Sequence, residues 1–405
     1  MLCVRQYKSI HEVDPEHWNS ILDKKDVFHA HGFIKIVEDS RTENAVFHYL
    51  LIYDNDQLVA TTVLSAFKIS LDLFISKNKL VSGIRKIFPN FFTIRILVCG
   101  LPASFGQLNI KVTDKKYTGE VSHVIAETMK SISRKMSISL MAVKEFRAGE
   151  MQLFVGFERE GFFPAHSIPY MNLKINWTTF SEYLSSLKHN YRRRILLSLK
   201  KINHTEPVIA PASYYNAASE HPALVLSRPG DEHFVNEFYR KYLEVMKRTP
   251  TKLETLNREF FSNLFKQENE SNLLNLVVQG KVVSSAVVIF AGDELVFMLV
   301  AKENDKDEYD SYFNLVYGII ALAIQNGCKK ISMGQTAYWV KQCVGAVPEP
   351  ESIYFASRKR LVHWILKSLR SVIFPETKLK SINVFRQKTV AIKEPAIVHE
   401  QFQDA

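Results

Sequence analysis

Residues 310–355 constrain the fold more than any other part of the chain, because they join an apolar helix to a polar turn marked by glycine. Asp310 has the short carboxylate that can cap a helix start. Residues 312–325 are apolar on nearly every side, which predicts a helix buried over most of its surface. Asn326-Gly327 is a typical helix stop, and residues 329–333 predict a short strand. The stretch therefore predicts a buried helix, then a strand that ends at a loop.

The loop after this strand brings several kinds of polar group together. It reads Gly334, Gln335, Thr336 and Ala337, and a short helical segment with Tyr338 and Lys341 follows. Tyr338 and Lys341 are three residues apart, which places them on one face of a helix. An amide, a hydroxyl, a phenol and an amine can line a polar site. The alternative, which the residue types alone favour, is a half-buried Tyr338 ring beside a solvated Lys341.

Charge and cysteine content bound the cellular setting. Lys and Arg number 52 against 42 Asp and Glu, a net charge of +10, which favours acidic partners such as phosphates, coenzyme A, carrier proteins, RNA or an anionic membrane. Four scattered cysteines and one isolated His29-x-His31 pair predict neither a disulfide framework nor a metal site. No signal-peptide core begins the sequence, and no apolar run reaches the roughly 20 residues of a membrane span. The expected location is the cytoplasm, either free or on the inner face of the membrane.

The order of predicted elements repeats once along the chain. Residues 1–175 predict a strand, two helices, an antiparallel hairpin and further elements, up to a strand at residues 168–175 that completes one mixed sheet. A basic helix over residues 178–204 opens a second half, in which two helices, three antiparallel strands, a helix and a strand recur. We expect an α+β (mixed α/β) chain with domains at 1–175 and 176–357, followed by a basic amphipathic helix and tail at 358–405.

Two segments combine apolar residues with interspersed cations. Residues 71–90 carry four Lys and Arg among their later positions, and residues 358–374 carry five. Such basic amphipathic segments can lie on an anionic membrane surface or bind a partner. The alternative is that each packs on its domain and exposes its cations to water.

Several motifs match one family pattern. They are Tyr312-Phe313-Asn314-Leu315, Asn326-Gly327-Cys328-Lys329, Gly334-Gln335-Thr336-Ala337-Tyr338 with Lys341, Gly345-Ala346, and, at the start of the second half, Ser186-Leu187 with Arg192. These motifs resemble the FemABX-like group of GNAT-type acyltransferases, which belong to peptidoglycan biosynthesis. The resemblance implies two tandem GNAT-like domains, each a largely antiparallel mixed sheet flanked by helices.

The resemblance also implies an activity, the transfer of an acyl or aminoacyl group from an activated donor to an amine on a small-molecule or lipid-like acceptor. Such a reaction needs two aligned substrates, a base for the amine and an acid for the leaving group. By resemblance, Tyr338 or Tyr312 would be the acid. Glu308 and Asp310, just before the buried helix, are the candidate bases, and the favoured alternative for Asp310 is that it only caps this helix. The expected binding residues are Lys341, Gly334, Gln335 and Thr336 for the substrate, with Arg192 and Arg193 for the donor.

The sequence leaves the donor open. GNAT domains hold the pyrophosphate of coenzyme A in a glycine-containing loop, but the matching residues 301–307 are mostly charged and acidic, and residues 110–116 also lack the glycines. Acyl-CoA, an acyl-carrier-protein thioester and an aminoacyl-tRNA all stay open as donors, and tRNA is the only nucleic acid expected as a partner.

The competing hypothesis is a non-catalytic binding protein with the same fold, which recognises an acidic ligand or an anionic membrane surface. The two hypotheses differ in where Tyr338 and Lys341 face. A position at the cleft between the domains, beside exposed strand N–H groups, favours an enzyme. Exposure to bulk solvent favours binding alone.

Overall fold

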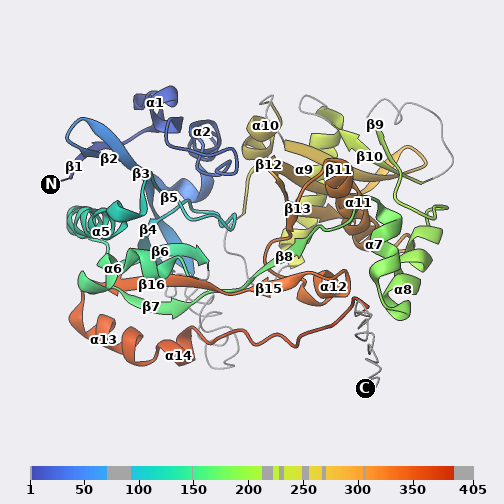
Figure 1. Cartoon of the computed structure of the whole chain (residues 1–405). Helices are drawn as coiled ribbons and strands as arrows, with labels where there is room; N and C mark the ends of the chain where they lie inside the picture. The colour runs from blue at the N-terminus through green and yellow to red at the C-terminus, as the bar shows by residue number, and fades with distance from the viewer. Residues whose placement is uncertain are drawn as a thin grey trace, which may run out of the picture.

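The computed structural model describes residues 2–70, 93–147, 149–211, 222–227, 232–248, 255–266, 271–303 and 307–386. The predicted basic segment at residues 71–90 lies outside these ranges. Within them, no helix combines the length and the apolar character needed to cross a bilayer. Two eight-stranded sheets lie side by side and carry helices on their faces (Figure 1), as the mixed α/β prediction requires.

The first sheet is built mainly from the N-terminal half. Its strands run in the order β1 (Cys3–Tyr7), β2 (Val46–Asp54), β3 (Gln57–Ser70), β4 (Thr93–Cys99), β6 (Leu140–Arg147), β16 (Glu351–Ser357) and β7 (Phe163–His166), with β5 (Ile110–Val112) paired to β3. All pairs are antiparallel except β4 with β6. Along β2, Leu50 and Ile52 enter one core while Tyr49 and Leu51 enter another, because successive side chains of a strand point to opposite faces.

The second sheet has the strand order β15 (Val347–Glu349), β8 (Tyr170–Lys174), β14 (Lys330–Ser332), β13 (Glu294–Lys302), β12 (Lys281–Ala291), β11 (Ser271–Val278), β10 (Ala223–Ser227) and β9 (Ile209–Pro211). The pairs β13–β14 and β9–β10 are parallel, and the others are antiparallel. Ala286 and Val288 of β12 face one core, whereas Val287 and Ile289 face the other. Both faces of this sheet are therefore covered.

Helices cover these faces. The first half contributes α1 (Pro15–Asn19), α2 (His31–Asp39), α5 (Thr118–Lys135), α6 (Gly156–Arg159) and the 3-10 helices η1 (Ile10–Glu12), η2 (Thr42–Asn44), η3 (Lys115–Tyr117) and η4 (Met151–Phe154). The second half contributes α7 (Phe180–Ser186), α8 (His189–Lys200), α9 (Glu232–Arg248), α10 (Arg258–Lys266), α11 (Ser311–Gln325) and α12 (Tyr338–Cys343). Last come α13 (Arg360–Ser368) and α14 (Arg370–Ile373). The single basic helix predicted over residues 178–204 is wrong in detail, because Leu187 is extended and separates α7 from α8.

The buried helix predicted at residues 312–325 is confirmed as α11, whose residues 314–324 are all buried. The predicted cap is wrong, however. Asp310 has a left-handed backbone and makes no capping bond. Its carboxylate instead accepts hydrogen bonds from Ser198 Oγ and Lys201 Nζ, each at 2.8 Å. Asp307 takes the capping role, since its Oδ1 accepts from the backbone N of Ser311 at 2.7 Å.

The two sheets exchange strands through a shared ribbon. Residues 163–166 pair antiparallel with residues 352–355 in the first sheet, and residues 170–172 pair antiparallel with residues 347–349 in the second. β7–β8 and β15–β16 thus pass together from one sheet to the other (Figure 1). The expectation that the strand at residues 168–175 completes the first sheet is therefore wrong. The domain boundaries at residues 175 and 357 stay a prediction. The two sheets do not divide at these residues, because β8 belongs to the second sheet and β16 to the first.

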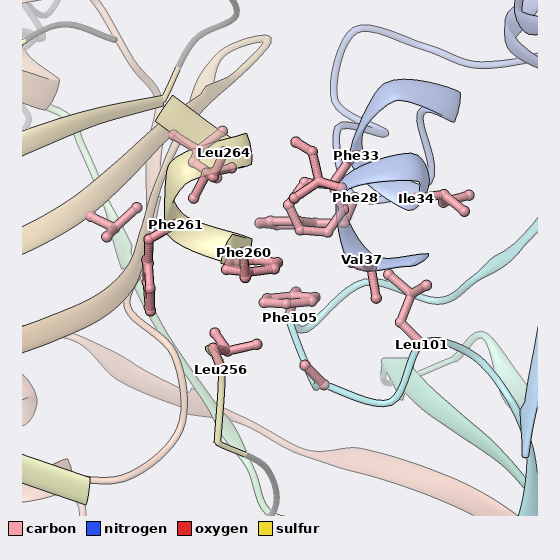
Figure 2. Packing of buried hydrophobic residues seen from close by; sticks show 14 of the residues in the cluster. Phe28, Phe33, Ile34, Val37, Leu101, Phe105, Leu256, Phe260, Phe261 and Leu264 are labelled. Atoms are coloured by element: carbon pink, nitrogen blue, oxygen red, sulfur yellow. The ribbon is translucent and has the colours of Figure 1, made fainter. Parts of the chain in front are cut away.

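An aromatic cluster joins the two halves. The ring of Phe105 stacks on Phe28 of the first half, with centroids 5.1 Å apart, and on Phe260 of α10, 6.4 Å away. The edge of Phe33, from α2, contacts Phe105 at 5.1 Å. Figure 2 shows these rings facing one another between α2, the loop that carries Phe105, and α10. Because all four are buried in one core, the halves are held by apolar packing as well as by the ribbon.

Candidate active site

A group of buried and half-buried residues with polar atoms lies where the ribbon crosses between the sheets. β8 contributes Tyr170, the turn after β14 contributes Gly334 and Gln335, α12 contributes Lys341, and β16 begins with Glu351. Gly334 has a φ of +74°, and a Cβ placed on it would be 3.9 Å from both Lys341 Nζ and Tyr170 Oη. The lysine and the phenol therefore converge on the backbone of this glycine.

Lys341 is 3% exposed in spite of its charge-bearing amine. Its Nζ donates hydrogen bonds to the carbonyl oxygens of Gln335 at 2.8 Å and Gly334 at 3.3 Å. Burial lowers the pKa of Lys341 to about 7, because the ammonium loses water and carbonyls alone replace it. A substantial share of this amine is therefore neutral near pH 7.

Glu351 is 2% exposed and shows the opposite shift. Burial first, and then the nearby carboxylate of Glu145, raise the pKa of Glu351 to about 8, although Arg147 and Lys144 act against this. Its Oε2 accepts a hydrogen bond from Gln335 Nε2 at 3.2 Å, while Oε1 has no partner among the described residues. Glu351 is therefore mainly a protonated acid near pH 7, with one oxygen uncommitted.

Gln335 connects the two shifted groups. Its carbonyl accepts from Lys341, and its side-chain amide donates to Glu351 and to the carbonyl of Ile168 at 2.9 Å. Ile168 lies between β7 and β8, the crossing of the ribbon. The turn is thus held against this crossing, which fixes the amine and the acid relative to each other.

A bulge in β6 directs a second carboxylate toward the same region. Ser352 pairs with Phe146 and Tyr354 with Val143, so two residues of β6 stand opposite one of β16. The second bulge residue, Glu145, has a φ of +70°, which is strained for a residue with a side chain. Its Oε1 accepts from the backbone N of Gly106 at 3.1 Å. The bulge therefore ties β6 to the 100–107 loop.

Arg147 and Tyr170 complete the link to this loop. Arg147 donates to the carbonyl of Gly106 at 3.0 Å, and Tyr170 Oη donates to the carbonyl of Phe105 at 3.3 Å. The loop thus presents Phe105 to the aromatic cluster on one side and its backbone to the polar group on the other.

Beside this group, two parallel strands of the second sheet separate. β13 pairs with β14 only over Glu294–Val296, although β13 continues to Lys302. Val287 pairs with Leu299 and Val288 with Phe297, which leaves Met298 as an extra bulge residue in β13. Beyond Val296, the edge of β13 that faced β14 has no paired strand among the described residues. Backbone groups at such an edge are free to bind a ligand.

Four predicted residues meet at this site. They are Gly334, Gln335, Tyr338 and Lys341. Tyr338 is half-buried, and its Oη donates to the carbonyl of Pro169 in the ribbon crossing at 3.4 Å. Burial raises the pKa of this phenol. Thr336 lies in the same turn, is exposed and has a φ of +67°. The interpretation that leaves Lys341 solvated is wrong, since tertiary packing buries it.

The other predicted residues lie outside this contact network. Tyr312 packs between the rings of Phe297 and Phe313, at 6.3 and 6.4 Å, and burial raises its pKa to about 12. Glu308 is exposed just before α11. Arg193 is exposed and Arg192 half-buried on α8. The neighbour Arg194 is the one that reaches α12, since its guanidinium lies 4.4 Å from the ring of Trp339. The roles of Tyr312, Glu308, Arg192 and Arg193 stay predictions.

The sequence analysis missed Glu351, Tyr170, Glu145 and Arg147. For Glu145, the sequence did contain a signal of a functional site, because this residue is a charged one within the largely apolar strand pattern of residues 140–146. Nothing local showed that these four side chains meet. Among the described residues, no group of three His, Cys, Asp or Glu is placed to hold a metal ion.

A separate cleft of about 410 Å³ lies between the halves, beside the aromatic cluster. Phe33 belongs to both, and Leu264, which also lines the cleft, is buried in the same core as the cluster. Its carboxylates Asp23 and Asp26 pair with Lys111 at 2.7 and 2.6 Å. Since these charges already have a partner, the cleft offers no reactive pair comparable to Lys341 and Glu351.

Comparison with known proteins identifies a family, a curated relative and solved structures with a similar fold. The model of the FemAB-like family, described as peptidoglycan biosynthesis/recognition, matches residues 9–361. A curated relative, putative 8-amino-7-oxononanoate synthase 2 of Mycobacterium tuberculosis, is 24% identical over 337 residues, 80% of this chain and 41% of the relative. The chain thus spans less than half the length of that protein.

Two solved structures show a similar fold. FemX superposes with a TM-score of 0.56 at 10% identity, covering 90% of this chain and all of FemX. A conserved protein of unknown function from Bacteroides thetaiotaomicron gives a TM-score of 0.50 at 9% identity, covering 88% of this chain and 99% of that one.

Proposed function

Because the chain belongs to the FemAB-like family of peptidoglycan biosynthesis and recognition, we propose that it transfers an acyl or aminoacyl group from an activated donor to an amine of a small-molecule or lipid-like acceptor. The resemblance noted in residues 310–346 agrees with this family, and the FemX-like fold agrees with two tandem GNAT-like units. The donor, the acceptor and a cytoplasmic location stay predictions.

One observation carries the proposal. A lysine with a lowered pKa and a glutamate with a raised pKa are joined by Gln335 beside the separating strands β13 and β14. Environments that shift the pKa of two groups toward neutrality in opposite directions are typical of acid–base sites. Amide formation needs both a proton acceptor and a proton donor at the same pH.

The proposed roles follow from these protonation states. The acceptor's amine nitrogen attacks the donor's carbonyl carbon, and the bond to the leaving oxygen or sulfur breaks. Neutral Lys341 takes the proton that the attacking amine loses, and protonated Glu351 gives a proton to the leaving group. Gln335 and Tyr170 position these groups. Tyr338, with its half-buried hydroxyl, is the second candidate acid.

The proposal is tested by single-turnover assays with three donor classes: aminoacyl-tRNA, long-chain acyl-CoA and acylated carrier protein, each with a panel of amines. We expect one donor class to lose its acyl group to an amine. Glu351→Gln and Lys341→Met should each slow this step by about 10²–10⁴-fold, the usual contribution of a general acid or base. Tyr338→Phe separates the two candidate acids.

Lys241→Met is the matched control, because Lys241 is equally buried but pairs with Glu237 in α9, away from the site. Its rate should stay near that of the parent protein. If no donor class is turned over while one still stabilises the protein against heat, the alternative of a non-catalytic binding protein replaces the proposal.

A further inference from the structure

The two helices that follow β16 carry an exposed apolar stripe. Leu361, Trp364 and Val372 are 70%, 65% and 73% exposed, and Ile365 and Leu369 are also exposed. Apart from the adjacent pair Trp364 and Ile365, these positions follow one another at intervals of three or four residues along α13 and α14, so they form one continuous stripe. Isolated exposed apolar residues are ordinary, but a continuous stripe marks an interaction surface.

The stripe is not the face that holds the helices to the protein. That inner face is formed by other residues: His363 lies edge-on to Phe163 at 5.3 Å, and Phe374 stacks on Phe355 at 4.5 Å. Leu366 and Ile373 pack into the same core. Since a separate set of side chains anchors α13 and α14, the exposed stripe is not needed to fix them.

Positive charge surrounds the stripe. Arg358, Lys359, Arg360, Lys367 and Arg370 are all exposed, and residues 358–375 contain no Asp or Glu. Figure 1 shows α13 and α14 at the lower edge of the molecule, beneath β7 and β16. An apolar stripe surrounded only by positive charges fits the boundary of an anionic bilayer. There the apolar side chains enter the acyl region and the cations contact the lipid phosphates.

We infer that α13 and α14 dock the protein on the surface of a bilayer that contains anionic phospholipids, through the stripe Leu361–Trp364–Leu369–Val372 and the five surrounding cations. The inference does not depend on the proposed transfer reaction, since binding to lipid is measured without a donor. A membrane surface at α13 would lie about 20 Å from Glu351, because the seven-residue strand β16 separates them.

Two other partners fit the surface less well. A nucleic acid would use the cations, but phosphate contacts leave an aliphatic stripe without a role. A protein partner would bury the stripe, but the centres of protein interfaces are depleted in lysine and in unpaired charge. A bilayer alone accounts for both the stripe and the uniform charge.

The test is co-sedimentation of the full chain with phosphatidylcholine vesicles, with and without one-third phosphatidylglycerol, at low and high salt. We expect binding only when phosphatidylglycerol is present, and weaker binding at high salt because surface charges are screened. Replacing Lys359 and Lys367 with Gln should weaken binding about 25-fold, since each cation near an anionic surface contributes about fivefold. Leu361→Gln with Trp364→Gln should abolish it.

Trp364→Phe tests insertion directly. This variant keeps an apolar ring, so it should still bind the vesicles, but it should lose the blue shift of tryptophan fluorescence that the parent protein shows on binding. Matched controls lie elsewhere on the surface: Lys115→Gln with Lys116→Gln in η3 removes the same charge, and Leu197→Gln changes an exposed apolar residue of α8. Both should bind as the parent does.

Three results would overturn the inference. The first is an absence of binding to phosphatidylglycerol vesicles at low salt. The second is binding that the α13 variants leave unchanged, because the docking surface would then lie elsewhere. The third is stronger binding to tRNA than to vesicles, together with loss of tRNA binding in the variant with Lys359 and Lys367 replaced. The cations would then bind nucleic acid and not lipid.

Discussion

The ring of Tyr170 packs directly on the backbone of Gly106. A Cβ on Gly106 would lie 2.3 Å from Cε2 of Tyr170, and Gly106 has a φ of +72° that favours glycine. This contact joins a strand of the second sheet to the 100–107 loop of the first half. The position of Tyr170 at the candidate site therefore depends on the absence of one methyl group.

Replacing Gly106 with Ala tests this contact. We expect a loss of about 3 kcal/mol in the free energy of unfolding, combining the cost of a left-handed alanine with displacement of the Tyr170 ring. Gly161→Ala is the control, because Gly161 has a φ of +82° but nothing near its would-be Cβ. It should cost only about 1 kcal/mol. Equal losses in urea unfolding of the two variants would argue against the packing role.

Glu351 should make stability fall as pH rises from about 4.5 to about 8. In the unfolded chain the carboxyl loses its proton near 4.5, while in the folded protein it keeps it to about 8. The folded state binds more protons between these values, so stability declines by up to about 1.4 kcal/mol per pH unit. Urea unfolding of Glu351→Gln over this range should show a flatter profile. A decline equal to that of the parent protein would contradict the assignment.

Lys341 should act in the opposite sense at higher pH. Its amine is neutral above about 7 when folded but stays charged to about 10.5 when unfolded. The unfolded state binds more protons in this window, so stability rises as pH increases from about 7 to about 10.5, and is lost as pH falls back through 7. Lys341→Met removes this rise. The same unfolding series measures it, and an unchanged slope would show that the lysine has water around it.

The stack of Phe105 on Phe260 should couple the two halves energetically. Phe260 is fully buried, so Phe260→Ala should cost about 4 kcal/mol in unfolding free energy. A double-mutant cycle with Phe105→Ala should give a coupling of about 1 kcal/mol, as aromatic pairs do. A cycle of Phe260→Ala with Phe146→Ala, a ring in a different core of the first half, should be additive. Equal coupling in both cycles would refute a direct interaction.

Elements with a strong local pattern were predictable from sequence. The apolar helix expected at residues 312–325 is α11, which is one residue longer. Its apolar residues continue around nearly the whole helix, which is enough to predict that most of its surface is buried. Capping was less predictable, because Asp307 and Asp310 are equivalent in sequence and only the backbone turn between them decides which one caps α11.

The candidate site could be predicted only in part. Gly334, Gln335 and Lys341 lie close together in sequence, so their meeting follows from one turn. Glu351 and Tyr170 join them only because the ribbon crosses between the sheets at this point, and strand exchange leaves no local signal. The pKa shift of Glu351 also depends on the charges of Glu145, Arg147 and Lys144, which lie about 200 positions earlier in the chain, so no local residue pattern encodes it.

The position of β16 also determines the order in which the protein can fold during synthesis. Within the part of the chain that the structure describes, β16 is the one strand paired with β7, and it lies between β7 and β6 in the interior of the first sheet. The ribosome, however, adds Glu351–Ser357 about 200 residues after β6. The N-terminal half must therefore leave the ribosome with an incomplete sheet, and its last strand arrives only after nearly all of the second sheet has been made. A nascent chain stalled before residue 351 should accordingly depend on chaperones to protect the open edge of β6.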